Sequence, residues 1–284
     1  WVTWRSPSLE LNDMGYLYTP DIIQEVFWVG YHNYEPFSIF RNFFVNFNQW
    51  YASTFGWEKI YMGGNANINA RFKNYWFASI GAEANTTSRS NTDLRGGPAL
   101  LSEPSFNAFF NISTNSRKKL IFSLGGNNYF GLHHEFSILN CYADMDWRIS
   151  KALKISLTPS VMFNNQQLAY VNNVEDSLLN MHYIRGSMRQ IETSLTIRLT
   201  YNITPDFTIQ YYGMPFVSAG DYDHFSRIAN PSSRNLYERF DEFSNLQISQ
   251  YIEDDKIKDI IPNQSIKNIS EFEAVDLRNK IILP

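Results

Sequence analysis

Apolar and polar side chains alternate with a period of two residues over long stretches of this chain. Within residues 190–203, Ile191 and Leu195 belong to an apolar set at odd positions, and Glu192 and Arg198 belong to a polar set at even positions. Successive side chains of a β-strand point to opposite faces of the sheet. The stretch therefore predicts a strand with one apolar face and one polar face. The same alternation recurs in residues 60–73, 106–115, 137–150 and 153–164.

These alternating runs are longer than the strands of most soluble sheets, which have about 5–6 residues. They match the length of a tilted membrane strand, which needs about 9–11 residues. The composition agrees, because aromatic residues reach 16% and charged residues only 18%, against about 25% charged in soluble domains. The chain has no apolar run of about 20 residues, as a membrane helix would need. A soluble β-sandwich also alternates and is the alternative fold.

The lengths of the connections also alternate along the chain. Short turns are predicted at 73–75, 115–118, 150–152 and 203–206, and longer polar stretches lie at 86–104, 127–134, 164–184 and 217–243. Outer-membrane barrels have short periplasmic turns and longer extracellular loops. We therefore predict an all-β fold, a transmembrane antiparallel β-barrel of the outer-membrane type with roughly a dozen visible strands.

The ends of the chain are less regular than its middle. Residues 26–33 and 41–54 predict strands, and residues 8–18 predict a strand or a plug-like segment. The charged residues after 250 predict that 251–274 is a soluble loop or a short amphipathic helix. We treat 1–284 as one barrel region. Because the chain starts at Trp1 without a signal peptide, we expect a processed product or fragment, an incomplete part of a larger barrel.

Five short segments carry a family resemblance. They are LNDMGYL at 11–17, FVNFNQW at 44–50, DLRGGP at 93–98, NSRKK at 115–119 and PFVSAG at 215–220. In these segments the chain resembles an uncharacterised outer-membrane β-barrel family of Bacteroidota, in which the barrel usually follows a carbohydrate-binding module of family-9 type. The resemblance implies a bacterial outer-membrane location and a glycan-related role, and it implies no catalytic residue. The sequence lacks such a module and the closing strands expected after Leu283.

Charged side chains on the predicted polar faces are candidates for lining a lumen. In a barrel they would form a charged constriction that selects solutes, or they would form salt-bridge ladders that fill a closed lumen. The residues do not decide between these alternatives. The set comprises Glu83, Asp144, Asp146, Arg148, Glu192 and Arg198.

The loop Asp93, Leu94, Arg95, Gly96, Gly97, Pro98 is the most distinctive connection. Gly-Gly-Pro permits backbone angles closed to other residues and then stiffens the chain. One hypothesis is that the loop folds inward and narrows the lumen, with Asp93 and Arg95 paired. The alternative is a plain tight turn.

Several patterns were weighed as chemistry. His133 and His134 are adjacent, and adjacent strand residues point to opposite faces, so we predict no metal site. Asp221, Asp223 and His224 have the composition of a catalytic triad, but close neighbours rarely take triad geometry. The chain contains no nucleophile elbow, P-loop, dinucleotide fingerprint or zinc spacing. Asp144 and Asp146 share a face, but one pair of carboxylates indicates hydrolysis only weakly.

These observations predict a non-enzymatic protein without a cofactor: an integral outer-membrane barrel that acts as a channel or as an uptake or binding protein for a surface solute, here related to glycans. The expected partners are outer-membrane lipid, other outer-membrane proteins and a glycan. The net charge of −4 and pI of 5.8 argue against a nucleic-acid partner, and the one cysteine, Cys141, excludes an intrachain disulfide. The first alternative is an accessory barrel with a filled lumen in a larger envelope complex. The second is an outer-membrane hydrolase acting on lipid or glycan, with its groups near 93–97 and 221–226.

Overall fold

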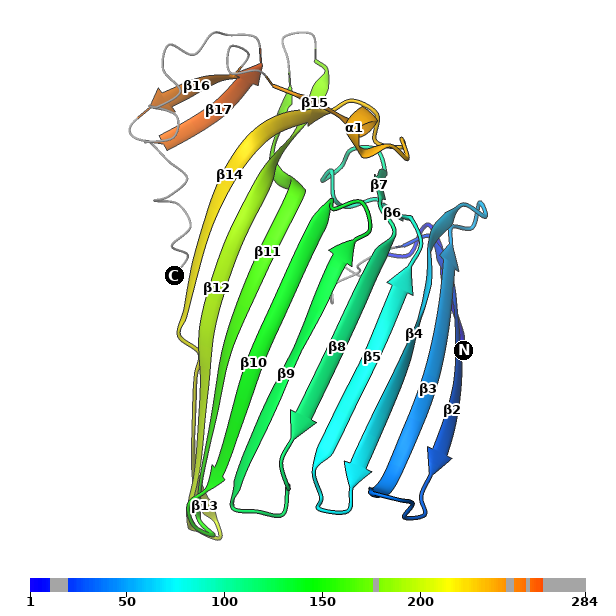
Figure 1. The fold of residues 1–284 in the computed structure, drawn as a ribbon. Coiled ribbons are helices and arrows are strands. Elements are labelled where there is room, and N and C mark those ends of the chain that lie inside the picture. The colour runs from blue at the N-terminus through cyan, green and yellow to red at the C-terminus, as the bar shows by residue number, and fades with distance from the viewer. Residues whose placement is uncertain (11–19, 176–178, 244–247, 254–255, 263–284) are drawn as a thin grey trace.

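The computed structural model describes residues 1–10, 20–175, 179–243, 248–253 and 256–262. Its described part is dominated by one antiparallel sheet of 13 strands (Figure 1). The strands are paired in the order β1-β2-β3-β4-β5-β8-β9-β10-β11-β12-β14-β15, and β13 also pairs with β12. Consecutive strands are therefore neighbours, as expected for hairpins joined by short connections. This confirms the all-β antiparallel prediction.

The strands of the large sheet match or exceed the predicted lengths. Their bounds are β1 Val2–Arg5, β2 Ile22–Asn33, β3 Phe40–Ser53, β4 Lys59–Phe72, β5 Phe77–Asn85, β8 Ser105–Ser113, β9 Leu120–Gly131, β10 Phe136–Arg148, β11 Leu153–Glu175, β12 Met181–Thr204, β13 Phe207–Gly213, β14 Phe216–Ile228 and β15 Phe240–Glu242. A small hairpin, β6 Ser88–Ser90 with β7 Leu100–Ser102, and the one-turn helix α1 Leu236–Arg239 lie at the loop end of the sheet.

β13 and β14 together act as one long strand beside β12. β13 pairs with the half of β12 near its turn, from Ile197 opposite Gly213, and β14 continues from Ser194 opposite Phe216 in the same register. The interruption falls at Met214 and Pro215, and proline cannot donate to a ladder. The Pro215 carbonyl still accepts a hydrogen bond from the Leu195 amide at 3.0 Å.

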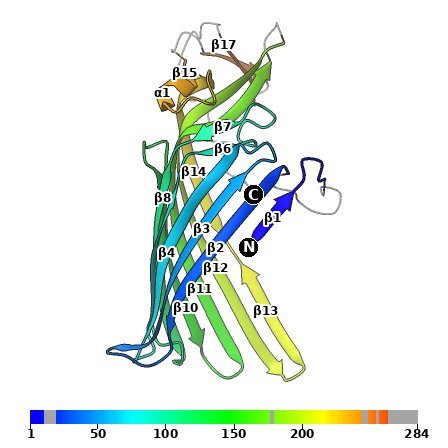
Figure 2. The ribbon, with the colours of Figure 1, turned by 90° about the vertical axis from the view of Figure 1, so that its right-hand side faces the viewer.

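The sheet is curved but open in the part of the chain that the structure describes. In Figure 2 the middle strands β8 and β10 lie on the left and the edge strands β1 and β13 on the right. The outer edges of β1 and β14 are not paired with each other. The described structure is therefore a curved antiparallel sheet, and closure into a barrel is not part of it.

The short turns and the long connection at 86–104 were predicted correctly, and the other three long loops were not. Residues 73–76, 114–119, 149–152 and 205–206 are turns, all at one end of the sheet (Figure 1). The stretches predicted as loops at 127–134, 164–184 and 217–243 are instead largely the ends of β9, β11, β12 and β14. The prediction was wrong because these strands continue with polar side chains on both faces, which removes the alternation but not the backbone pairing.

Two other predictions concern the ends of the chain. The strand or plug at 8–18 lies mostly outside the described residues. The loop or helix predicted for 251–274 is corrected where the structure describes it, because β16 Ile248–Glu253 pairs with β17 Lys256–Pro262 as a hairpin.

Within the described residues no second layer covers the large sheet, so its buried apolar clusters are small. One cluster joins Ile22, Ala52 and Ile60, and the other joins Leu94, Leu100 and Ile228. Among the residues that the structure describes, no helix has the length and apolarity that a bilayer crossing would require.

Candidate functional site

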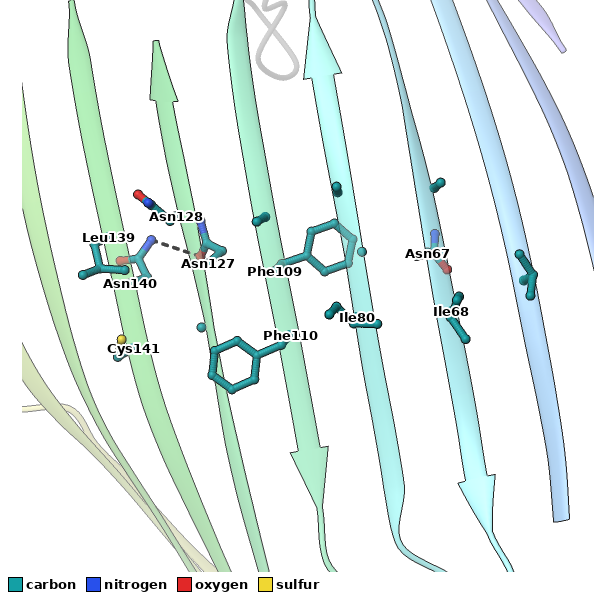
Figure 3. Close-up of a pocket in the computed structure, with 16 residues that line it drawn as sticks. Asn67, Ile68, Ile80, Phe109, Phe110, Asn127, Asn128, Leu139, Asn140 and Cys141 are labelled. Carbon is teal, nitrogen blue, oxygen red and sulfur yellow. Dashed lines mark hydrogen bonds between the residues drawn. The ribbon is translucent and has the colours of Figure 1, made fainter. Parts of the chain in front are cut away.

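One face of the sheet presents a belt of exposed apolar side chains. The belt continues across neighbouring strands through directly paired residues. One such row comprises Val45 on β3, Ile68 on β4, Ile80 on β5 and Phe110 on β8. Ile80 is 63% exposed, Ile68 48% and Phe110 40%. Figure 3 shows Ile68, Ile80 and Phe110 beside one another on this face. We call this surface the apolar belt.

Polar and aromatic rows limit the apolar belt at its two ends. Towards the long loops, the paired residues Ser137, Asn165, Arg189 and Asp221 form a polar row across β10 to β14. Towards the short turns, Trp147 on β10 is paired with Leu120 and Ile155, and Tyr201 on β12 is paired with Leu153 and Ile209. The belt is thus a band with defined borders, and aromatic residues mark the border at the turns.

A hollow of about 610 Å³ lies in the middle of the apolar belt (Figure 3). Small residues form its floor, because Ala66, Ala82 and Ala108 are paired in one row. Ile80 and Phe110 stand beside that row. The surface of the belt is therefore uneven at this hollow, and nearly all of the hollow's lining is apolar.

The opposite face of the sheet is lined by amides and hydroxyls that bond to one another. Asn46 donates to Asn67 at 3.0 Å, Asn69 donates to Asn67 at 2.8 Å, and the Ser79 hydroxyl donates to Asn69 at 2.8 Å. Further along, Asn140 donates to Asn127 at 3.3 Å (Figure 3). We call this surface the polar face.

The six charged residues predicted to share the polar face do so. Glu83 accepts a hydrogen bond from Asn85 at 2.7 Å, Asp144 accepts one from Thr158 at 2.7 Å, and Asp146 forms an ion pair with Lys154 at 3.1 Å.

The remaining three form no ion pair within 4.0 Å in the described part of the chain, although Arg148 is paired with Lys154 across the strands and its charge acts on Asp146. Arg148 donates to the Ser116 carbonyl at 3.2 Å, and the Arg198 guanidinium lies 4.9 Å from the centre of the Tyr212 ring. Glu192 is paired with Met162 and Ser218 across the strands. Within the described residues these charges do not gather into one ladder, so the hypothesis of a salt-bridge ladder filling the lumen has no support here.

A polar hollow of about 770 Å³ lies on the polar face at the loop end. Arg5 of β1, Asn85 of β5 and Gln166 of β11 all contribute to its wall. Strands so far apart in the sheet can share one hollow only because the polar face is concave. Its other linings include Gln24, Tyr61, Arg89, Asp93, Tyr129 and Glu135. We call this hollow the vestibule.

The loop at 93–98 folds onto β11 and β12 beside the vestibule. Leu94 is fully buried, and its carbonyl accepts a hydrogen bond from Asn173 at 2.9 Å. Gly96 has a φ of 101°, which favours glycine. A Cβ on Gly97 would lie 2.4 Å from Cε1 of Tyr183, so a side chain at position 97 would have to displace the Tyr183 ring. The loop is therefore anchored and is more than a plain turn.

The pairing of Asp93 with Arg95, which one of the two hypotheses for this loop required, is absent from the described ion pairs. Arg95 stacks over the Tyr170 ring at 3.6 Å, and Arg185 contacts the same ring at 5.0 Å. Arg185 also donates to the Asp93 main-chain carbonyl. Burial lowers the pKa of Arg185, against the opposing charge of Asp93. A tyrosine thus took the place that an acidic partner had been expected to fill.

A buried charge cluster between the vestibule and α1 was not found by sequence reasoning. The Glu103 carboxylate accepts a hydrogen bond from the Glu135 backbone amide at 2.6 Å. The Glu135 carboxylate accepts one from the Glu103 backbone amide at 3.2 Å. Arg239 of α1 donates to both carboxylate oxygens of Glu135, at 3.0 and 2.9 Å, and its side chain is 1% exposed. Burial raises the pKa of Glu135, and Arg239 opposes that shift. No local pattern signals this cluster, because Glu135 and Arg239 are 104 residues apart in the chain.

The histidines take part in ordinary contacts. His133 Nδ1 lies 3.3 Å from Glu103. His224 is hydrogen-bonded to Glu242 at 2.6 Å, while Asp223 pairs with Arg189 at 2.9 Å. Asp223 and His224 therefore have separate partners. The described residues hold no group of three acidic, histidine or cysteine side chains placed to bind a metal ion.

Comparison with known proteins adds one finding. Neither a curated protein nor a solved structure matches the chain. A family described as a domain of unknown function, DUF5916, matches residues 2–254, which include the apolar belt, the polar face and the vestibule. The chain belongs to the DUF5916 family.

Proposed function

We propose that this chain forms the wall of a transmembrane β-barrel in a bacterial outer membrane. In this proposal the apolar belt faces lipid and the polar face lines the lumen. The barrel admits or binds a polar solute, for which we favour a glycan. The proposal requires strands beyond the described ones, or a second chain, to close the sheet.

The exposed apolar belt is the observation that carries the proposal. Contiguous exposed apolar patches larger than a few hundred Å² are rare on soluble monomers and mark membrane or protein contacts. Here the belt crosses β3 to β12, and the opposite face bonds its amides to one another. A soluble sandwich buries its apolar face against a second sheet. A membrane barrel faces lipid with that surface and holds polar groups inside.

The strand lengths support the same proposal. β9 and β10 have 12 and 13 residues, and β11 and β12 have 23 and 24. Crossing a bilayer takes about 9–11 residues of a tilted strand. The longer strands therefore cross the bilayer and project beyond it at the loop end, where they carry the vestibule.

The vestibule favours an uncharged, hydroxyl-rich solute over an ion. Its wall combines amides from Gln24, Asn85 and Gln166 with the rings of Tyr61 and Tyr129. Amides donate and accept hydrogen bonds equally well, and tyrosine rings offer flat apolar surface with a polar tip. The cationic and anionic groups of the wall are mixed, so neither sign dominates.

Conductance across a planar bilayer tests the channel part of this proposal. The full-length protein is expected to give discrete ionic currents that oligosaccharides reduce. Replacing Tyr61 and Asn85 together by alanine should weaken that block, and Thr196→Ala, below the vestibule on the polar face, should not. A correctly inserted barrel that insulates would overturn the channel. Stable co-purification with other outer-membrane proteins would then favour the accessory barrel.

A further inference from the structure

The two ends of the sheet carry opposite charge. The short-turn segments 34–41, 71–77, 113–120, 147–154 and 202–207 contain nine Lys or Arg residues and two Asp or Glu residues. The described connections at the other end, likewise extended into the adjoining strands (52–60, 84–106, 130–137, 173–175, 179–183 and 227–243), contain six basic and eight acidic residues. The chain as a whole has 24 basic and 28 acidic residues, so the basic turns are not a reflection of overall composition.

Two arginines from different turns converge on one tyrosine at this basic end. Arg41, at the start of β3, lies 4.8 Å from the centre of the Tyr75 ring and donates to its hydroxyl at 2.8 Å. Arg117, from the β8–β9 turn, lies 4.4 Å from the same ring. Neither guanidinium has a carboxylate within 4.0 Å in the described part of the chain.

The tyrosine is held in a tight turn. Tyr75 has a φ of 67°. The Asn74 side chain accepts a hydrogen bond from the Trp76 main-chain amide at 3.0 Å. Arg117 is likewise placed by its turn, since its amide donates to the Asn115 side chain at 2.9 Å. Tyr75 and Arg117 are thus placed by the backbone of their turns, and both Arg41 and Arg117 are exposed.

Apolar aromatic side chains are next to Tyr75 and Arg41 in the chain. Trp76 follows Tyr75 in the chain and is 43% exposed on the side of the apolar belt. Phe72 precedes the same turn, and its ring lies 5.3 Å from that of Phe40. A molecule whose charged group is bound at Arg41 and Arg117 would therefore place its apolar part against the short-turn end of the apolar belt.

We propose that the cluster of Arg41, Tyr75 and Arg117 binds the phosphate of an anionic phospholipid in the leaflet at the short-turn end. The phosphodiester oxygens accept hydrogen bonds from the two guanidiniums, which bind phosphate in a planar, two-pronged manner. The acyl chains lie along the apolar belt past Trp76. Further turn cations, among them Lys73, Lys118, Lys119 and Lys151, add long-range attraction that salt screens.

This inference rests on the proposed membrane location, so the test has two separate readouts. The full-length protein is reconstituted into vesicles of phosphatidylcholine alone, where protection from protease reports insertion. The protein in neutral detergent is then titrated with short-chain phosphatidylglycerol and with short-chain phosphatidylcholine, and bound lipid is counted by native mass spectrometry. Failure to insert into any vesicle refutes the membrane proposal. Insertion with equal binding of the two lipids refutes only the inference.

Variants locate the lipid on the protein. Each removed cation is expected to weaken the anionic lipid about fivefold, so R41Q with R117Q should reduce the preference for phosphatidylglycerol about 30-fold. The double variant R41K with R117K should keep part of that preference. The matched control, R189Q with R227Q at the loop end, should leave the preference unchanged.

Inorganic phosphate distinguishes a lipid site from a site for free phosphate. At equal concentration it should fail to displace the lipid, because it lacks the apolar part that lies against the belt. Displacement by phosphate, or a loss of preference in the loop-end control as large as in R41Q with R117Q, would overturn the inference.

Discussion

Replacing Ile80 by lysine tests whether the apolar belt meets lipid or water. Ile80 is 63% exposed, and its neighbours across the strands are Ile68 and Phe110. If this face met water, a substitution at so exposed a position would change stability by no more than about 0.5 kcal/mol. If the face meets lipid, a lysine ammonium there must leave water.

The position of Ile80 sets the size of the penalty. It lies four residues from Trp76 in the short turn and four from Ala84, near the polar row. At about 3.3 Å per residue, it is about 13 Å from each border of a band about 25 Å tall, before strand tilt is counted. A lysine near the midplane costs about 2–4 kcal/mol. The folding equilibrium constant should therefore fall by roughly 30-fold to 700-fold, at about 1.4 kcal/mol for each factor of ten.

Reversible denaturant unfolding in phosphatidylcholine vesicles, followed by tryptophan fluorescence, measures this change. Thr196→Lys is the matched control, because Thr196 lies on the polar face and its hydroxyl makes no hydrogen bond within the described residues. We expect the control to change the free energy of unfolding by less than about 1 kcal/mol. Equal, small effects of both substitutions would refute the assignment of the belt to lipid.

Three further predictions concern the loop end. Glu135→Gln leaves the buried Arg239 without its anion. In the same unfolding assay it should lower the free energy of unfolding by about 3–5 kcal/mol. The control Glu242→Gln, at an exposed position, should lower it by less than about 1 kcal/mol. Gly97→Ala would press its Cβ against Tyr183 and should cost about 1–3 kcal/mol, a loss that the truncation Tyr183→Ala should partly reverse in a double-mutant cycle. The hydrogen bond that the His224 ring donates to Glu242, followed by the charge of Asp223, raises the pKa of His224. The stabilisation from this pairing should be complete below pH 6.5 and disappear as the pH rises through the raised pKa. NMR titration of the ring would locate that pKa, and Glu242→Gln should lower it.

The sequence was sufficient for the strands of the belt and for the assignment of residues to faces. Alternation of the kind seen at Ile191, Glu192 and Arg198 depends only on the geometry of an extended chain, so a single sequence carries it. The short turns followed for the same reason, since an antiparallel strand must reverse where the alternation stops. Curvature and closure depend on twist and shear summed over many strands, which no local pattern encodes.

The loop end could not be predicted, because its contacts join residues far apart in the chain. Arg185 bonds to Asp93 across 92 residues, and Arg239 to Glu135 across 104. The vestibule, too, is assembled by side chains from β1 to β11. Local reading could identify Gly96 and Gly97 as unusual but could not identify Tyr170 and Tyr183 as the rings that Arg95 and Gly97 meet.

Site-directed spin labelling along β12 tests the orientation of the sheet most directly. Single cysteines are placed at each position from 190 to 200 in a Cys141→Ser background, the labelled protein is inserted into vesicles, and collisions with oxygen and with a water-soluble nickel chelate are measured. Our account predicts that oxygen accessibility oscillates with a period of two residues. It should be high at Ile191, Thr193, Leu195 and Ile197 and low at Glu192, Ser194, Thr196 and Arg198. High nickel accessibility at the first set would place the apolar belt in water and contradict the account.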